Sequence, residues 1–294
     1  MIAPGYSMEE IDLQFLEKSL SFLEEHSKKR KESPFFLFHS AQAVHLPSFP
    51  ADQFKGKTKA GPHGDFIFEL DYIVGKLMAA LDKYGFADNT LVIFSSDNGP
   101  EVPTVLSMRQ DYKHDGARPW RGVKRDNWEG GHRVPFIARW PGKIKPGTRS
   151  SQTLSLTDLM ATFAAITNVK LPKGAGEDSV NMLPAFIGSD EGKSIRKYTL
   201  HQTISLALAI RRGPWKYLDH RGSGGNNYDG SGRWGMKKYI VPDKELQAPG
   251  QLYNLDTDPG ETNNLYFKRS ETVSYTHLRA HETGRNLVCR LLLE

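Results

Sequence analysis

One short stretch, TLVIFSSDNG at residues 90–99, constrains the fold more than any other part of the chain. Its first seven residues form an apolar run with β-branched members, which is typical of a buried strand. The run stops at Asp97-Asn98-Gly99, so two side chains with oxygen donors follow the carboxyl end of the strand. Ligands of open α/β sheets bind at that edge. Because Asp-Asn-Gly is also a common turn, the tripeptide alone allows either interpretation.

The residues after this strand favour a binding loop over a hairpin. Pro100-Glu101-Val102-Pro103 would interrupt the second strand of a hairpin, and a long polar loop follows. Lys124 in this loop could contact an anion, although most single lysines are solvated surface residues. The loop also contains glycines, which allow close backbone approaches that side chains would block, at positions 116, 122, 130 and 131.

Hydrophobic spacing predicts a strand-helix-strand unit that includes this strand. Leucines three and four positions apart predict an amphipathic helix over residues 7–29. Residues 34–39, PFFLFH, are predicted to form a buried strand, and residues 67–81 a helix that Gly85 closes. With the strand at 90–96, these elements predict a right-handed βαβ unit in a mostly parallel sheet. The loops that contain His45 and Asp97 would then lie at the same edge of this sheet.

The second half of the chain changes character after residue 189. Before it, residues 134–139 are predicted to form a strand, and a nearly continuous apolar run that Asp158 caps predicts a buried helix. Beyond it, short strands joined by turns predict a small antiparallel sheet, with strands at residues 198–200, 207–210, 215–218 and 251–256.

Three motifs together resemble one protein family. FSSDNGP, followed by RGVKRDNWEGGHRVPFIARWPG, is similar to the second half of the catalytic domain of sulfatases, in the alkaline-phosphatase-like superfamily. AVHLP at residues 43–47 resembles a further signature of that family. The resemblance, which extends over residues 33–267, implies an α/β fold with a mostly parallel central sheet and flanking helices. It places the downstream part of the catalytic domain at 1–188 and a C-terminal antiparallel subdomain at 189–269.

The resemblance also implies a function and a set of site residues. It implies a calcium-dependent, formylglycine-type sulfuric ester hydrolase that acts on an aryl or carbohydrate sulfate. Asp97 and Asn98 would bind Ca²⁺, with Mg²⁺ a less favoured ion, because both side chains offer only oxygen. Lys124 would contact the sulfate and the leaving-group oxygen, and His45 would donate a proton to the leaving group.

Other residues near Lys124 are candidates for contact with the substrate. We expect His114 and Asp115, in the preceding loop, to meet the organic part of a sulfate ester, and Arg121 to contribute positive charge. Tyr112 and Trp120 could stack on a sugar or aryl ring, or could simply pack the loop.

The family's nucleophile motif, Cys/Ser-x-Pro-Ser/Ala-Arg, lies upstream of these elements and is not found in the chain. Ser48-Phe49-Pro50-Ala51 is followed by Asp52 in place of Arg, and Cys289 stands in CRLLL. We therefore expect a fragment that begins partway through a sulfatase and lacks activity alone. The tail at 270–294 looks like translated read-through, and we do not expect its His277 and His281 to bind zinc.

Two alternatives stay open. A phosphoesterase of the same superfamily usually holds two metals and has His where Asn98 stands. A pseudoenzyme could bind sulfated glycans through Lys124, Arg121 and Arg133 without catalysis.

The formal net charge of +5 is dispersed and argues against nucleic-acid binding. No run approaches the ~18 apolar residues of a membrane helix. Family resemblance implies a periplasmic, secreted or lysosomal protein, and it leaves the oligomeric state open.

Overall fold

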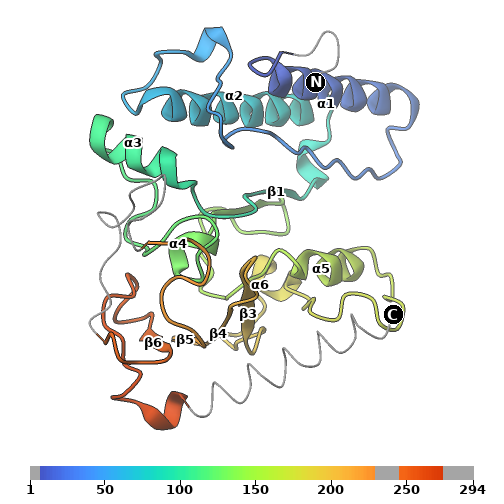
Figure 1. Cartoon of the computed structure of the whole chain (residues 1–294). Helices are drawn as coiled ribbons and strands as arrows, with labels where there is room; N and C mark the ends of the chain where they lie inside the picture. Colours follow the sequence, from blue (N-terminus) through green and yellow to red (C-terminus); the bar gives the residue numbers. More distant parts are fainter. Residues whose placement is uncertain (1–6, 229–244, 274–294) are drawn as a thin grey trace. The chain divides into compact units, whose positions relative to one another are not determined.

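The computed structural model describes residues 7–228 and 245–273. The chain forms two compact units (Figure 1), which are described separately below. The first contains residues up to 92, 101–116 and 139–142, and the second contains 93–100, 117–138 and the residues from 143 onward. The predicted domain boundaries at 188 and 269 stay predictions. The expectations for His277, His281 and Cys289 lie outside the described residues.

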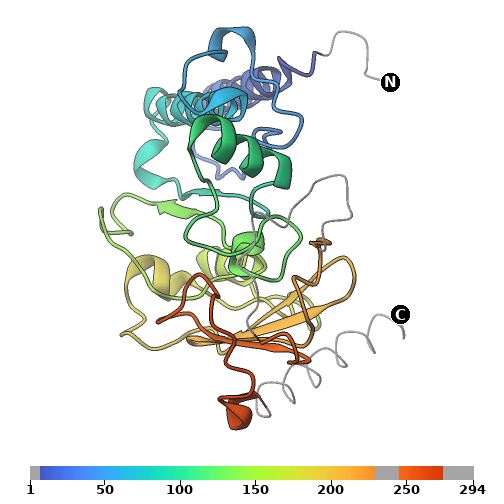
Figure 2. The ribbon, with the colours of Figure 1, turned by 60° about the vertical axis from the view of Figure 1, so that its left-hand side comes forward.

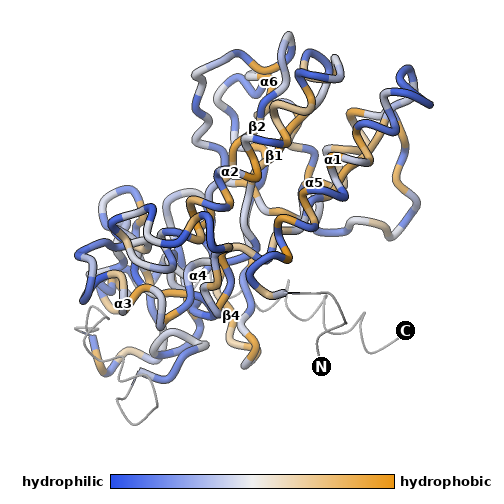
Figure 3. Tube along the Cα trace, turned by 90° about the horizontal axis from the view of Figure 1, so that it is seen from above, coloured by the Kyte–Doolittle hydropathy of each residue, from blue (hydrophilic) through white to orange (hydrophobic). Residues whose placement is uncertain are grey.

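Two long helices form the core of the first unit. Helices α1 (Ile11–Lys29) and α2 (Gly61–Lys83) pack side by side (Figures 1 and 2). Hydrophobic and hydrophilic residues alternate along them (Figure 3), as an amphipathic helix requires. The same unit contains three shorter helices, namely η1 (Asp52–Phe54), η2 (Ala87–Asn89) and α3 (Val102–Tyr112). Both predicted helices are thus confirmed, and Gly85 beyond α2 has a φ of +74°.

The buried face of α2 agrees only in part with the apolar spacing that predicts this helix, which is Ile67, Leu70, Val74, Leu77 and Leu81. Leu81 is buried, whereas Ile67 is 43% exposed, and Phe66 and Ile73, outside that spacing, are buried as well. Two carboxylates, Asp65 and Glu69, share the buried face. Their backbone partners, described below, explain why apolar spacing alone did not identify this face.

The prediction that residues 34–39 form a buried strand is wrong, because these residues are neither a strand nor buried. The segment is not part of a sheet within the described residues, and Phe36 and Phe38 are 74% and 79% exposed. Phe35 and Leu37 pack against the cluster around Leu23, so only every second side chain is covered. Without a first strand, the described residues do not contain the predicted βαβ unit, and the mostly parallel central sheet is not confirmed.

The second unit begins with a small two-stranded sheet. Strands β1 (Val92–Ser95) and β2 (Phe136–Arg139) pair, and the short helix α4 (Glu129–His132) precedes β2. Both strands lie where the sequence predicts them. The residues of β1 are half-buried rather than fully buried, since the described sheet has only these two strands.

Polar contacts hold helix α5 (Asp158–Ile166), although we expected its apolar residues to be buried. Only Asp158 and Thr162 in this helix are buried, and Met160 is 47% exposed. The Asp158 carboxylate accepts backbone N–H groups of Ser155 and Val180 at 2.8 and 2.9 Å and pairs with a guanidinium. Helix α6 (Leu183–Ile187) follows.

Four strands form the antiparallel sheet that the sequence predicts. Their order is β3-β4-β5-β6, and every neighbouring pair is antiparallel. The strands are β3 (Thr199–Gln202), β4 (Leu208–Arg212), β5 (Trp215–Leu218) and β6 (Gln251–Asn254). Trp128 packs in one cluster with Ala209, Leu218 and Tyr253, which ties the glycine-rich loop to this sheet.

No helix over residues 7–228 and 245–273 combines the length and the apolar character that crossing a bilayer requires.

Candidate functional site

The loop after β1 presents two polar side chains whose oxygens have no partner among residues 7–228 and 245–273. Asp97 is exposed and Asn98 is half-buried. Within the described part of the chain, no group hydrogen-bonds either side chain, although the Ser96 hydroxyl donates to the Asn98 carbonyl at 3.2 Å. Gly99 is buried. The loop is therefore anchored by its backbone, while both predicted metal ligands keep their side-chain oxygens available.

Two backbone hydrogen bonds join this loop to the loop that carries Lys124. The Gly99 N–H donates to the Gly131 carbonyl at 2.9 Å, and the Lys124 N–H donates to the Pro100 carbonyl at 2.9 Å. The structure thus brings the loop of Asp97 and Asn98 against the backbone of Lys124. Segments that lie more than twenty residues apart in the sequence form one pair of interlocked loops.

Glycines make this interlocking possible. A Cβ atom on Gly99 would lie 1.8 Å from the Gly130 carbonyl oxygen, and one on Gly130 would lie 2.2 Å from the Gly122 carbonyl oxygen. A Cβ on Gly131 would approach the Asp126 carbonyl oxygen to 2.1 Å. The predicted close approaches are confirmed at positions 122, 130 and 131. The prediction was wrong for Gly116, where an added Cβ would meet nothing within 4 Å.

Asn226 and Tyr228 hold the Lys124 loop through a second set of contacts. Asp126 accepts the Val123 N–H at 2.9 Å and an Asn226 side-chain N–H at 2.7 Å. The Asn226 amide also donates to the Lys124 carbonyl at 2.8 Å, and the Tyr228 hydroxyl donates to Asp126. Burial raises the pKa of Asp126, while these hydrogen bonds oppose the rise. Sequence reasoning missed this set, because its residues lie about a hundred positions apart.

Arg121 has structural partners that the sequence did not reveal. Its guanidinium lies 3.8 Å from the ring centre of Trp128. It donates to the Tyr253 hydroxyl at 3.0 Å and to the Glu261 carbonyl at 2.9 Å, and the residue is only 6% exposed. These contacts link the glycine-rich loop to the sheet, and the predicted contact of Arg121 with substrate stays a prediction.

A buried ionic cluster lies beneath the same loop and was not predicted. The Lys216 ammonium lies 3.0 Å from carboxylate oxygens of Glu129 and Glu261 and 3.1 Å from Nε2 of His132. Although burial would raise it, the charge of Lys216 and its hydrogen bond hold the pKa of Glu129 well below its usual value. Burial raises the pKa of Glu261 despite the attraction of Lys216.

Two histidines complete this cluster. The His132 and His201 rings stack with their centres 3.7 Å apart. Burial and the Lys216 charge lower the pKa of His132 well below its usual value and that of His201 to about 3. Both rings are therefore neutral near pH 7.

The remaining predicted site residues belong to the first unit. His45 is exposed, and its Nδ1 lies 2.6 Å from the Leu46 carbonyl oxygen. His114 is also exposed. Asp115 pairs with Arg109 through both oxygens, at 2.5 and 3.0 Å. The structure therefore gives Asp115 a protein partner, and its predicted contact with substrate stays a prediction.

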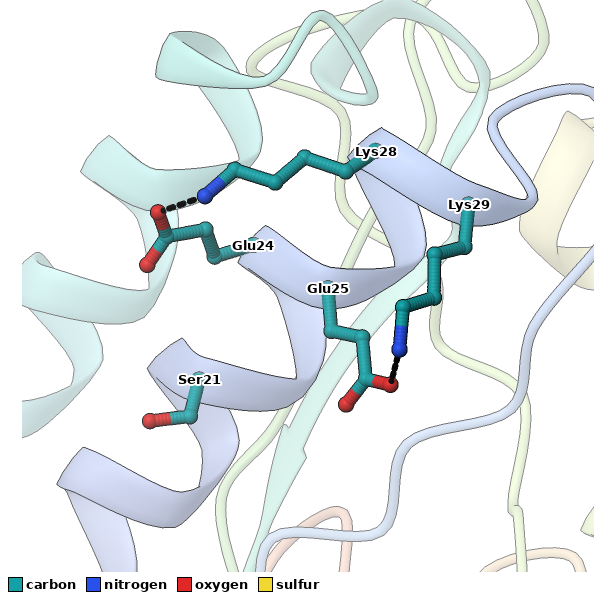
Figure 4. Close-up of a pocket in the computed structure, with 5 residues that line it drawn as sticks. All are labelled: Ser21, Glu24, Glu25, Lys28 and Lys29. Atoms are coloured by element: carbon teal, nitrogen blue, oxygen red, sulfur yellow. Dashed lines mark hydrogen bonds and ion pairs between the residues drawn. The ribbon is translucent and has the colours of Figure 1, made fainter.

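A hollow of about 260 Å³ on α1 does not coincide with these residues. It is lined by Ser21, Glu24, Glu25, Lys28 and Lys29 (Figure 4). The two Lys-Glu pairs, each 2.6 Å long, are solvent-exposed pairs one helical turn apart, which is the usual arrangement of a solvated helix face. We do not assign chemistry to this hollow.

Over residues 7–228 and 245–273, the loop of Asp97 and Asn98 included, no three His, Cys, Asp or Glu side chains gather in a way that could hold a metal ion. A metal in the interlocked loops would therefore depend on the Asp97 carboxylate and on amide, carbonyl or water oxygens.

Known proteins share the motifs and the fold. A sequence model of the sulfatase family matches residues 4–169. An N-acetylgalactosamine-6-O-sulfatase of Bacteroides thetaiotaomicron is 36% identical over 259 residues, which cover 87% of this chain and 47% of that protein. Human arylsulfatase A is 33% identical over 243 residues, which cover 81% of this chain and 45% of that protein. The chain thus spans about half the length of the curated relatives it matches.

Solved structures with a similar fold also include sulfatases. A Bacteroides thetaiotaomicron structure, described under the metabolism of multiple glycosaminoglycans, has a TM-score of 0.79 and 32% identity and covers 95% of this chain and 55% of that one. A sulfatase from Pseudoalteromonas sp. has a TM-score of 0.76 and 27% identity, covering 97% of this chain and 56% of that one. With the family match over more than half of the residues and this shared fold, the chain belongs to the sulfatase family.

Proposed function

We propose that the protein carrying this chain hydrolyses sulfate esters of a sugar or an aryl alcohol, with the interlocked loops of Asp97 and Lys124 as part of its active site. The observation that carries this proposal is the pair of backbone hydrogen bonds, Gly99 to Gly131 and Lys124 to Pro100, each 2.9 Å long. They hold two oxygen donors and a cationic residue on adjoining loops. The curated relatives act, by name, on N-acetylgalactosamine 6-sulfate groups and on aryl sulfates.

The donor atoms of Asp97 and Asn98 are of the type that calcium binds. Asp97 and Asn98 offer only oxygen, and neither side chain is engaged by another described residue. Ca²⁺ takes six to eight oxygen ligands, so other oxygen atoms would complete the site. When bound, the ion would supply positive charge for the sulfate oxygens.

The chain's own residues would then act on the ester. Lys124 would stabilise negative charge on the sulfate and on the leaving-group oxygen. His45 would donate the proton that the departing alkoxide takes up. The 294 residues contain no Cys/Ser-x-Pro-Ser/Ala-Arg motif. We therefore propose that a formylglycine outside this sequence is the nucleophile and that these residues alone do not turn over the ester.

Lys124→Ala tests the proposal. In the protein as its source expresses it, we expect kcat/KM for 4-nitrophenyl sulfate and for a sugar 6-sulfate to fall by roughly 100-fold or more, because a charge that stabilises the transition state is lost. Lys143→Ala is the matched control, since Lys143 is exposed in a surface turn. We expect Asp97→Ala to abolish the dependence of activity on added Ca²⁺ after chelation.

Two results would contradict this proposal. One is full activity of Lys124→Ala. The other is faster hydrolysis of 4-nitrophenyl phosphate than of the sulfate by the unsubstituted protein, which would favour the phosphoesterase alternative.

A further inference from the structure

A buried carboxylate on α1 holds the loop that carries His45. Asp12 is 1% exposed, and each of its oxygens accepts one backbone N–H. The Gln42 N–H donates to Oδ1 at 2.7 Å, and the Ala43 N–H donates to Oδ2 at 2.8 Å. Hydrogen bonds to an ionised carboxylate are short and strong, and two of them to consecutive residues fix both position and direction of the backbone.

These two residues belong to the same turn as His45. The His45 N–H donates to the Gln42 carbonyl at 2.8 Å, which closes the turn. His45 Nδ1 lies 2.6 Å from the Leu46 carbonyl oxygen. Because a carbonyl oxygen can only accept, Nδ1 must carry the proton of this bond. Proton exchange with a substrate would therefore take place at Nε2, and the orientation of the ring follows from the turn.

We propose that Asp12 is a positioning residue for His45. Its carboxylate sets the turn at residues 42–45, and the turn sets where Nε2 of His45 lies. The inference rests on the proposed function, in which His45 is the proton donor to the leaving group. Asp12 itself does not touch the substrate in this scheme.

A matched control exists on α2. The buried Asp65 carboxylate also accepts two backbone N–H groups, from Gly56 at 2.7 Å and Thr58 at 2.8 Å. These residues lie at least eleven positions beyond His45 in the chain. Asp65→Asn therefore removes the same kind of contact from the same unit without touching the turn of His45.

The test compares leaving groups. We would measure kcat and KM of the protein, as its source expresses it, for aryl sulfates whose phenols differ in pKa. Loss or misplacement of the proton donor lowers kcat most for esters with poor leaving groups, that is, phenols of high pKa. For Asp12→Asn we expect kcat to fall roughly 10- to 100-fold for the poorest leaving group and less than about threefold for 4-nitrophenyl sulfate, with KM within about twofold. His45→Ala should show the same trend more strongly, and Asp65→Asn should show no trend.

An activity-independent measurement separates this inference from the proposed function. Asp12→Asn should change the imidazole NMR signals of His45, whereas Asp65→Asn should not. In the unsubstituted protein, the amides of Gln42 and Ala43 should be protected from hydrogen exchange, a result that does not require the variant to fold.

Unchanged His45 signals or unprotected amides would each overturn the role of Asp12, and so would an equal fall in kcat for all leaving groups in Asp12→Asn when His45→Ala does show the leaving-group trend. By contrast, if the His45 signals and the amides behave as expected while His45→Ala shows no leaving-group trend, Asp12 still positions His45, and the proton-donor role in the proposed function is what fails.

Discussion

Among single residues, Lys216 has the environment that the sequence least suggests. Its side chain is fully buried between Glu129 and Glu261, with 3.0 Å to each carboxylate. Replacing Lys216 by Met would leave the buried Glu261 carboxylate without its cation, whereas Glu129 would keep Arg133 at 3.0 Å and Arg211 at 3.6 Å. We expect the free energy of unfolding at pH 7 to fall by about 3–5 kcal/mol, because an unpaired buried charge is costly. Urea denaturation followed by tryptophan fluorescence measures this change.

Lys28→Met is the control for this prediction. Lys28 also pairs with a glutamate, but its side chain is 68% exposed, so the pair is screened by water. We expect the urea midpoint of Lys28→Met to match that of the unsubstituted chain. Equal midpoints for the Lys216 and Lys28 variants would show that the buried cluster does not stabilise the fold.

At the scale of elements, helix α2 holds the preceding loop through two carboxylates whose pKa values are shifted in opposite directions. Glu69 is fully buried and accepts the Ala51 N–H at 2.8 Å through one oxygen. Burial, with a smaller contribution from the nearby acidic residues Asp12 and Glu10, raises its pKa to about 7. For Asp65, burial acts in the same direction, but the backbone N–H groups of Gly56 and Thr58 outweigh it and lower the pKa.

The raised pKa of Glu69 predicts a pH dependence of stability. Between its ordinary value of 4.5 and about 7, the folded state binds the proton that the unfolded state has lost. Stability should therefore fall as pH rises through this window, by at most about 1.4 kcal/mol per pH unit. Glu69→Gln should remove this fall, which urea denaturation at pH 4.5, 5.5, 6.5 and 7.5 would detect.

For Asp65→Asn we expect the opposite dependence of stability on pH. The lowered pKa of Asp65 contributes stability that is present above its ordinary value of 3.8 and is lost at lower pH. Asp65→Asn should therefore lower the free energy of unfolding more at pH 6 than at pH 3. An unchanged difference between the Glu69→Gln and unsubstituted chains across pH 4.5–7.5 would contradict the raised pKa.

At the scale of the whole molecule, exposed aromatic residues predict poor solubility of the 294-residue chain. Phe36 and Phe38 are 74% and 79% exposed on one side of an extended segment. Exposed apolar patches of this kind promote association. We expect the double substitution Phe36→Ser with Phe38→Ser to raise the soluble fraction of the expressed chain and to reduce its light scattering, without lowering its thermal midpoint.

Phe35→Ser is the matched control, because Phe35 lies on the covered side of the same segment. Its ring packs against Phe86 with the centres 5.3 Å apart and against the cluster around Leu23. This substitution should lower the thermal midpoint and should not improve solubility. If the double substitution leaves scattering unchanged, the exposed face does not cause association.

The sequence by itself determined the family, the segments of the candidate site and most secondary structure. Local patterns suffice for these, since the spacing of apolar residues specifies α1, α2 and the strands β3 to β6, and the run ending at Asp97 marks a loop after β1. Glycines at 122, 130 and 131 were identified as close-approach positions because only glycine permits such contacts.

Only the tertiary structure decided which faces are buried and which polar groups meet. Helix α5 and residues 34–39 are as apolar as buried elements, yet the described residues cover them only in part. The contacts of Lys216 with Glu129 and of Asp12 with Gln42 join positions 87 and 30 residues apart. No local pattern encodes such pairs, because a buried charge is tolerated only where the folded chain supplies its partner.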